Sequence, residues 1–203
     1  MPFISFEGID GSGKSEQVRR IVEHLRDSGR SVLQTKEPDG GHLGAEVRAI
    51  LTRPQRTLDA TEQLLLVSAA RYDHVKNVIR PALAAGAWVV SDRFLDSTSA
   101  FQVSVSETNL RPLFQAACDI VVGTTLPDLT LILDLPPQVA ISRRRLRGDQ
   151  EDDPAEKTRD FSAIRSALLE IARNDRRRCR VVNADQPVDQ VAAAVRRIIE
   201  QSL

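Results

Sequence analysis

The stretch Gly8-Ile9-Asp10-Gly11-Ser12-Gly13-Lys14-Ser15 decides the fold of this chain. It fits the phosphate-binding loop pattern G-x-x-x-x-G-K-[ST], which requires a strand before it and a helix after it. The apolar residues 3–6 predict that strand, and a helix is expected over about 14–28. The glycines let backbone N–H groups converge on phosphate oxygens, and the helix N-terminus adds partial positive charge. In such a loop Lys14 reaches the β- and γ-phosphates of a nucleotide, and the Ser15 hydroxyl binds Mg²⁺.

Outward from this loop, short apolar segments alternate with helical patterns. Further strands are expected at 31–35, 88–91, 129–135 and 180–183. Short, mostly apolar strands are typical of a parallel sheet covered on both faces. Asp59 with Glu62 resembles a capping box that opens a helix through about Ala85, and a last helix is expected over 187–202. The alternation predicts a three-layer α/β/α fold of the P-loop NTPase type, with a five-stranded parallel sheet surrounded by helices, in one domain spanning 1–203.

Composition excludes several classes of partner. The chain has 28 Lys plus Arg and 28 Asp plus Glu, so no net field favours nucleic acid or a membrane surface. No apolar run approaches transmembrane length, and the N-terminal residues lack the layout of a signal peptide. Cys118 and Cys179 lie far apart in the sequence and form no metal-spaced pair. We therefore expect a cytoplasmic protein with reduced thiols.

A second phosphate site is indicated by isolated arginines near strand ends and helix starts, namely Arg48, Arg71 and Arg93. Arginine binds phosphate through two parallel hydrogen bonds and stays charged at any working pH. Asp92-Arg93 directly follows the strand expected at 88–91, which puts both residues beside the phosphate-binding loop. The guanine-reading motif N-K-x-D and the transporter signature L-S-G-G-Q are both absent from the sequence. These features favour a kinase over a GTPase or a transporter subunit.

Five acidic residues fall within 149–156, directly after the basic stretch 143–147. One interpretation is a solvated helix end and loop. The other is a mobile lid over about 143–160, flanked by arginines that meet phosphates.

Five motifs, taken together and in order, resemble the thymidylate kinase family. They are FEGIDGSGKS at 6–15, TKEPDGG at 35–41, LLLVSAARYDHV at 64–75, IRPALAAGAWVVSDRFLDSTSAFQ at 79–102 and PDLTLILDLPPQVAISRRRLRG at 127–148. The run D-R-F-x-x-S-x-x-A-F-Q, which begins at Asp92, is the most specific of them. The resemblance implies ATP-dependent, Mg²⁺-assisted phosphorylation of dTMP to dTDP by a homodimer, to which the helix around 61–85 would contribute.

The resemblance also implies roles for individual residues. Lys14, Arg93, Asp10 and Asp92 would be catalytic, and Ser15 and Asp92 would hold the metal. The ATP-binding set would be Gly8, Ile9, Asp10, Gly11, Ser12, Gly13, Lys14, Ser15, Arg143 and Arg147. The set that binds the acceptor nucleotide would be Asp10, Glu37, Arg48, Val67, Arg71, Arg93, Ser97, Phe101 and Gln102. Within that set, Asp10 would meet the 3′-hydroxyl, Arg48 and Arg93 the phosphate, and Arg71, Ser97 and Gln102 the base.

The chain departs from the family pattern at three informative places. Val67 stands where the family has a Phe that stacks on the base, and such stacking contributes about 1–3 kcal/mol. Asp39 and Gly41 replace a glycine and a threonine of the family's loop, and a carboxylate there would repel the acceptor phosphate unless it is paired or turned away. Glu151-Asp152 stands where the family often has an Asp-Arg pair in the lid. Five arginines are candidates to replace that missing charge, namely Arg143, Arg144, Arg145, Arg147 and Arg159.

Two alternatives follow from these departures. Val67 and Asp39 suggest a kinase for a different or modified pyrimidine monophosphate. The acidic lid suggests a nucleotide-binding relative with impaired catalysis, which the intact Lys14, Ser15 and Arg93 oppose.

Overall fold

The fold is built on one parallel sheet. The computed structural model describes residues 1–53, 56–148 and 159–203. Its strands run in the order β2-β3-β1-β4-β5. They are β1 (Phe3–Glu7), β2 (Val32–Lys36), β3 (Trp88–Asp92), β4 (Leu129–Asp134) and β5 (Cys179–Asn183). Each strand begins and ends within one residue of its predicted bounds, which confirms the predicted five-stranded parallel sheet.

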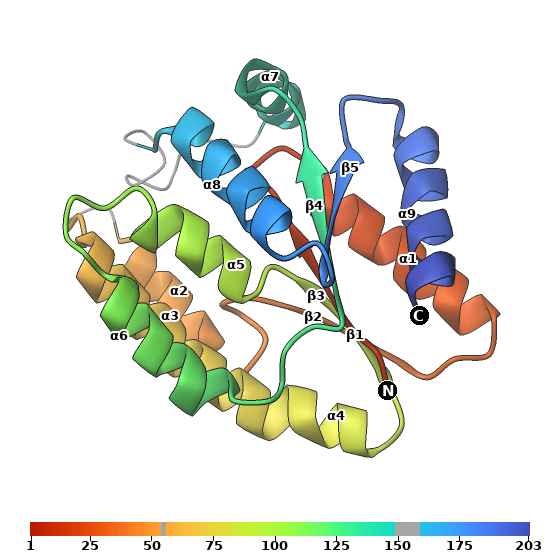
Figure 1. The fold of residues 1–203 in the computed structure, drawn as a ribbon, viewed down its shortest axis with the longest axis horizontal. Coiled ribbons are helices and arrows are strands. Elements are labelled where there is room, and N and C mark those ends of the chain that lie inside the picture. Colours follow the sequence, from red (N-terminus) through yellow and green to blue (C-terminus); the bar gives the residue numbers. More distant parts are fainter. Residues whose placement is uncertain (54–55, 149–158) are drawn as a thin grey trace.

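Helices cover both faces of the sheet, so the predicted α/β/α layering is also confirmed (Figure 1). The α-helices are α1 (Lys14–Asp27), α2 (Gly44–Leu51), α3 (Ala60–His74), α4 (Arg80–Ala84), α5 (Leu95–Thr98), α6 (Arg111–Ala117), α7 (Pro137–Arg147), α8 (Phe161–Asn174) and α9 (Val188–Ser202). The described residues also form three π-helical segments, which are η1 (Val75–Ile79), η2 (Ser99–Val103) and η3 (Cys118–Val122). Helices α1 and α9 pack together on one face, whereas α4, α5 and α8 lie on the other. Helix α7 lies beyond the carboxyl ends of β4 and β5 (Figure 1).

The helix predicted to run to about Ala85 is three joined segments, α3, η1 and α4. Its start is confirmed, because the Asp59 carboxylate accepts from the Glu62 N–H at 2.8 Å and the Glu62 side chain accepts from the Asp59 N–H at 3.0 Å. The π segment η1 ends just before Pro81, which lacks the N–H of a regular helical turn. A wider turn before the proline keeps the helix continuous, and periodicity alone did not predict it.

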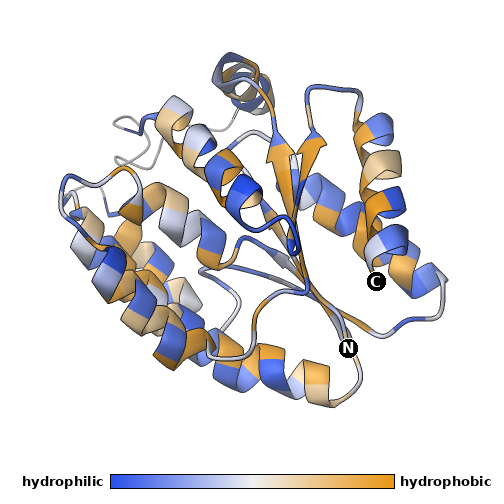
Figure 2. Ribbon diagram, in the orientation of Figure 1, coloured by the Kyte–Doolittle hydropathy of each residue, from blue (hydrophilic) through white to orange (hydrophobic). Residues whose placement is uncertain are grey.

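The core lies where the apolar strands meet the apolar faces of the helices (Figure 2). The largest cluster joins Ile4 and Phe6 of β1 and Leu131 of β4 to residues of α1, α8 and α9. A second cluster on the α4 side contains Phe3, which meets the Phe94 ring edge-on at 4.9 Å. Both faces of β1 are therefore fully buried, as a central parallel strand requires.

The register of the strands brings their carboxyl ends to one edge of the sheet. Phe6 pairs with Asp92 across β1 and β3, and Lys36 pairs with Asp92 across β2 and β3. The loop after β1 and the turn after β3 are consequently neighbours, which is where open α/β sheets bind ligands. Among the described residues, no helix combines the length and the apolar character needed to cross a bilayer.

Candidate active site

The loop between β1 and α1 wraps around a buried lysine. The Lys14 side chain folds back so that its Nζ donates to the carbonyl oxygens of Gly8 and Ile9, each at 3.1 Å. Burial, together with the nearby Arg93 charge, lowers the pKa of Lys14 to about 8. Because phosphate oxygens carry full negative charge, they are stronger partners for this ammonium than the two carbonyls are. The loop therefore holds a cation ready for an anionic ligand.

Gly11 of this loop is packed directly against α7. It has φ +90°, and a Cβ atom there would lie 2.4 Å from the Ala140 carbonyl oxygen and 3.0 Å from Cγ of Arg144. A side chain at position 11 would thus collide with the backbone of α7. Any additional positive charge in the site must come from elsewhere in the chain.

A second pair of groups lies at the N-terminus of α1. The Ser15 Oγ donates to Oδ2 of Asp92 at 2.5 Å, which joins the first turn of α1 to the end of β3. Both are oxygen ligands of the kind that Mg²⁺ prefers, and Mg²⁺ usually takes only one or two from the protein and the rest from water and phosphate. The residues predicted to hold the metal are therefore adjacent and chemically suitable.

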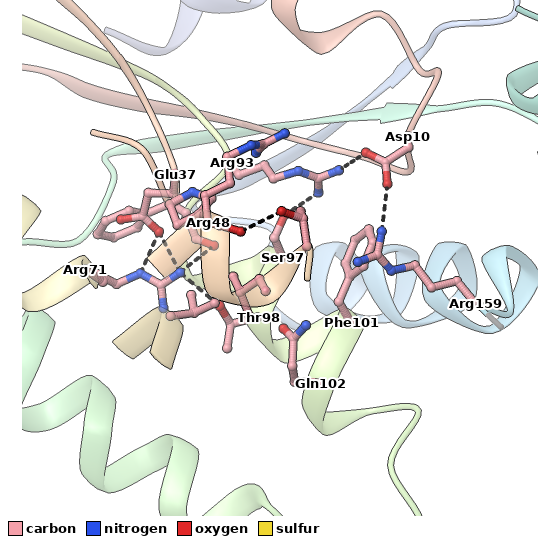
Figure 3. Close-up of a pocket in the computed structure, with 15 residues that line it drawn as sticks. Asp10, Glu37, Arg48, Arg71, Arg93, Ser97, Thr98, Phe101, Gln102 and Arg159 are labelled. Atoms are coloured by element: carbon pink, nitrogen blue, oxygen red, sulfur yellow. Dashed lines mark hydrogen bonds and ion pairs between the residues drawn. The ribbon is translucent and has the colours of Figure 1, made fainter. Parts of the chain in front are cut away.

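Arg93 connects the phosphate-binding loop to the neighbouring pocket. Its Nη2 lies 2.5 Å from Oδ1 of Asp10, while Nη1 donates to Ser97 Oγ at 2.8 Å and to the Gly8 carbonyl oxygen at 3.3 Å. The guanidinium also stacks on Phe101, 4.7 Å from the ring centroid. Figure 3 shows these side chains converging from β1, β3 and the helix after β3. Arg93 and Lys14 both donate to the Gly8 carbonyl, so the two cations lie together at the phosphate-binding loop, as predicted from the position of Arg93 after β3.

The backbone of Arg93 adopts φ +71°, the left-handed region that non-glycine residues rarely occupy. Such a conformation costs about 1 kcal/mol or more. It is held by the Arg93 N–H, which donates to the Phe6 carbonyl at 2.9 Å, and by Ser91 Oγ, which donates to the Arg93 carbonyl at 2.7 Å. This backbone geometry turns the guanidinium over the loop instead of along the strand.

Asp10 lies between two guanidinium groups. Its Oδ1 meets Arg93, and its Oδ2 lies 3.5 Å from Nη1 of Arg159, which precedes α8 (Figure 3). Burial works to raise the pKa of Asp10, but the charges of Arg93, Lys14 and Arg159 outweigh it and hold that pKa well below its usual range. Asp10 is therefore an ionised acceptor at any physiological pH.

Next to Asp10 a pocket of about 220 Å³ opens between α2, α3 and the helix after β3. Every residue predicted to bind the acceptor nucleotide lines it. The pocket is lined by Asp10, Glu37, Pro38, Arg48, Leu51, Thr52, Val67, Arg71, Arg93, Phe94, Ser97, Thr98, Phe101, Gln102 and Arg159. Side chains far apart in the sequence, from Asp10 to Arg159, are thus brought around one cavity that shares Asp10 with the phosphate-binding loop.

Arg71 is fixed at the closed end of this pocket. Its Nε donates to Glu37 Oε2 at 2.8 Å, and its Nη2 donates to Thr98 Oγ1 at 2.9 Å and to the Phe94 carbonyl at 3.2 Å. The other oxygen of Glu37 faces Nδ1 of the buried His74 at 3.1 Å. Glu37 therefore holds Arg71 in place, a contact that the sequence did not predict.

Asp39 does not present an unpaired charge to the pocket. Its Oδ2 lies 2.8 Å from Nζ of Lys36 and 3.6 Å from Nη1 of Arg48. Gly41 is required by close packing, because a Cβ atom there would lie 2.4 Å from Oδ2 of Asp73 on α3. Arg48 itself is more than half exposed and lies at the pocket rim. The altered loop is therefore compatible with an anion beside Arg48.

The predicted lid region, 143–160, is described only at its two ends, and residues 149–158 lie outside the described part of the chain. At one end, Arg143 Nη1 donates to the Ala184 carbonyl at 2.9 Å, which ties α7 to the segment after β5. The side chain of Arg147 also lies outside what the structure describes. At the other end, Arg159 stacks over Phe101 at 5.6 Å from the ring centroid. Among the four of these five arginines whose side chains the structure describes, Arg159 is the one in the pocket lining.

Comparisons with known proteins agree with this geometry. The family model described as "Thymidylate kinase" matches residues 6–195. The thymidylate kinase of Dinoroseobacter shibae is 44% identical over 195 residues, which cover 95% of this chain and 93% of that protein. That of Magnetococcus marinus is 42% identical over 200 residues, with 98% and 95% covered. The crystal structure of thymidylate kinase from Ehrlichia chaffeensis superposes with a TM-score of 0.77 at 29% identity, covering 98% of both chains.

Proposed function

This chain belongs to the thymidylate kinase family, and from that membership we propose that it transfers the γ-phosphoryl group of ATP to the phosphate of dTMP, which yields dTDP and ADP. It is therefore a phosphotransferase that works on nucleotides. The observation that carries the proposal is Arg93, whose guanidinium contacts both the phosphate-binding loop at Gly8 and the adjoining pocket at Ser97. One cation at that junction touches donor and acceptor phosphates together.

On the donor side, the loop from Gly8 to Ser15 binds the phosphates of ATP through its backbone N–H groups. Lys14 exchanges its two carbonyl partners for oxygens of the β- and γ-phosphates. Ser15 and Asp92 would hold Mg²⁺, Asp92 through water, and the ion would supply positive charge to the phosphates of ATP. From the resemblance to the family we assign Arg143 and Arg147 to the ATP-binding side, where Arg143 donates to the Ala184 carbonyl after β5.

On the acceptor side, Arg48 and Arg93 hold the phosphate of dTMP, and Asp10 accepts a hydrogen bond from its 3′-hydroxyl. The ionised state of Asp10 suits an acceptor for that hydroxyl. Phe101 shapes the sugar site beneath the two guanidinium groups. The base occupies the closed end of the pocket, where Arg71, held by Glu37, supplies hydrogen-bond donors. Val67, Ser97 and Gln102 complete its surroundings.

Arg159 supplies the positive charge that Gly11 and Asp152 do not. Its guanidinium lies 3.5 Å from Asp10 and on the same aromatic ring as Arg93. Charge on the transferring group is spread over three oxygens, so an added guanidinium lowers the barrier by stabilising that charge. Position 11 has no room for an arginine side chain, which supports Arg159, on the far side of the pocket, as the source of the positive charge.

The chemistry needs no general base. An oxygen of the dTMP phosphate, already an anion, forms the new P–O bond, and the bond between the γ-phosphorus and the oxygen bridging it to ADP breaks. No proton has to be removed from the nucleophile. Lys14, Arg93 and Arg159 stabilise the charge, while the pocket and the loop align the two substrates.

We also propose that the enzyme is a cytoplasmic homodimer. Helix α3 carries two exposed apolar side chains, Leu65 and Tyr72, and the neighbouring segment η3 exposes Ile120. An apolar surface of this kind favours self-association through this side of the molecule. Sedimentation of the protein with and without Leu65→Glu measures the association directly.

A panel of nucleoside monophosphates assayed with ATP and Mg²⁺ tests the function. We expect dTMP to be among the best acceptors, and an acceptor order that excludes it would refute the proposal. Lys14→Ala is expected to abolish turnover while the circular dichroism spectrum stays that of the wild type. Lys76→Ala, on the exposed side of η1, is the matched control and is expected to keep full activity.

A further inference from the structure

We propose that Glu7 is a positioning residue, which fixes Arg93 in the orientation that phosphoryl transfer needs by holding the turn after β3 from beneath. The proposal rests on the proposed function for the role of Arg93. Glu7 ends β1, immediately before the phosphate-binding loop, and its side chain is fully buried. A buried carboxylate in a mostly apolar strand requires partners that compensate for its loss of water.

Both oxygens of Glu7 are occupied by the turn that carries Arg93. Oε1 accepts a hydrogen bond at 2.8 Å from the N–H of Phe94, the residue that directly follows Arg93. Oε2 accepts the Ser97 hydroxyl at 2.5 Å, and the same Ser97 oxygen accepts from Nη1 of Arg93 at 2.8 Å. Glu7 thus reaches Arg93 by two routes, one through its backbone and one through its guanidinium.

The backbone route acts on the unusual conformation of Arg93. A residue with φ +71° persists only where the surrounding contacts hold it. The bond from the Phe94 N–H to Glu7 lies on one side of Arg93, and the bond from the Arg93 N–H to the Phe6 carbonyl lies on the other. Residues 6 and 7 of β1 therefore clamp the turn at both ends.

The side-chain route depends on charge. A Ser97 hydroxyl that donates to a carboxylate keeps its lone pairs for Arg93, so the three groups form a chain of charge-assisted hydrogen bonds. If Glu7 is protonated, its OH group competes with Arg93 for the Ser97 oxygen, and in Glu7→Gln the amide NH₂ group does the same. The guanidinium then loses one of the contacts that orient it above the loop.

The groups around Glu7 make the charge of its carboxyl group depend on pH near neutrality. The ionisable groups that interact with it in the described part of the chain include Asp96 of α5, Arg93, Lys14 of α1 and Cys179 of β5. Asp96 is itself paired with Arg178 at 2.5 Å. Burial, with a smaller contribution from Asp96, raises the pKa of Glu7 to about 7, against hydrogen bonds from Ser97 and Phe94 that lower it.

The test compares wild-type protein with Glu7→Gln, Ser97→Ala and the double variant, in steady-state assays from pH 5.5 to 8.5. For Glu7→Gln at pH 8 we expect kcat/KM for dTMP to fall 10- to 100-fold, with KM for ATP unchanged within about twofold. The wild-type decline in rate on acidification through pH 7 should become shallower in Glu7→Gln. The effects of Glu7→Gln and Ser97→Ala should be less than additive, because both interrupt one chain of contacts.

Ser5→Ala is the matched control. Ser5 lies on the same face of β1 and is also fully buried, but its hydroxyl bonds to Thr130 at 2.8 Å and not to the Arg93 turn. We expect its kinetic constants to stay within about threefold of the wild type. If Glu7→Gln matches Ser5→Ala in kcat/KM, or keeps the wild-type pH profile, Glu7 is only a structural residue and the proposal is wrong.

A readout without turnover separates this proposal from the proposed function. The Nε–Hε NMR signal of Arg93, assigned with Arg93→Lys, is expected to shift with pH around 7 in the nucleotide-free wild type. The same shift should be absent in Glu7→Gln or, if that variant does not fold, much reduced in Ser97→Ala. A signal that is independent of pH in the wild type overturns the role of Glu7, whether or not dTMP is the acceptor.

Discussion

The Ser15 hydroxyl and the Asp92 carboxylate, 77 positions apart in the chain, are joined by a hydrogen bond of 2.5 Å. The bond closes the gap between α1 and β3 at the carboxyl edge of the sheet. It also aligns two oxygen donors with the phosphate-binding loop. The residues that bind the metal in our proposal are therefore organised by the protein itself.

Asp92→Asn is expected to lower kcat at least about 100-fold and to raise the Mg²⁺ concentration needed for half-maximal rate. A neutral amide is a weaker ligand for Mg²⁺ and for its bound water than a carboxylate is. Titration of the rate with Mg²⁺ at saturating ATP measures both effects. Asp134→Asn, which alters a carboxylate at the end of β4 that is paired with Arg165, serves as control. An unchanged Mg²⁺ dependence in Asp92→Asn would contradict the metal assignment.

Val67→Phe is expected to lower KM for dTMP about fivefold, with little change in KM for ATP. An aromatic ring stacked on a base contributes about 1–3 kcal/mol, and the lower end of that range corresponds to this change. Steady-state kinetics with dTMP as the varied substrate provide the measurement. Leu65→Phe, at an exposed position of the same helix, should leave KM for dTMP as it is. An unchanged KM in Val67→Phe would mean that residue 67 does not face the base, and a higher KM would contradict stacking at this position.

Arg159→Ala is expected to reduce kcat about 100-fold or more while KM for each substrate changes by less than about threefold. The reason is that a charge placed on the transferring group acts mainly in the transition state. Arg159→Lys should recover part of the loss. Arg173→Ala, which removes an exposed arginine of α8, should behave like the wild type. Equal losses in the two alanine variants would assign the effect to overall charge and not to position.

Glu7→Gln is expected to become more stable relative to the wild type as pH rises from 5 to 8. Folded wild-type protein binds the Glu7 proton more tightly than the unfolded chain does, since the pKa rises from 4.5 to about 7 on folding. Wild-type stability therefore falls across that window, by up to about 3 kcal/mol, whereas the glutamine variant has no such proton. Urea unfolding at the two pH values measures the difference. If the stability difference between the wild type and Glu7→Gln is the same at pH 5 and pH 8, the raised pKa of Glu7 is excluded.

Much of the fold was accessible from the sequence because the signals are local. Most of the strands are short, mainly apolar runs, and the loop at 8–15 identifies the strand at the centre of the binding edge. Asp59 and Glu62 defined the start of α3 through a contact across three residues. The sequence did not predict the π segments, because a single wide turn within a helix does not change the spacing of apolar residues enough to be recognised.

The site was predicted where its residues follow strand ends, as Asp92 and Arg93 do. It was left open where proximity depends on the path of the chain, as for Arg159, which reaches Asp10 from 149 positions away. Glu7 gave no signal at all, because an acid at the end of a strand usually lies in solvent. Only the packing of α5 over β1 reveals that its carboxylate is buried beneath the Arg93 turn.

The pairing of Phe6 with Asp92 has a consequence for how this enzyme can change. Successive strand residues face opposite sides of a sheet, so the loss of one residue within β3 would put Arg93 in the place of Asp92, beside Ser15. The gain of one residue would instead put Asp92 in the place of Arg93, over the pocket, and either change gives one substrate site the wrong charge. The length of β3 is thereby fixed by chemistry, while the exposed connection at 104–109 is free to lengthen.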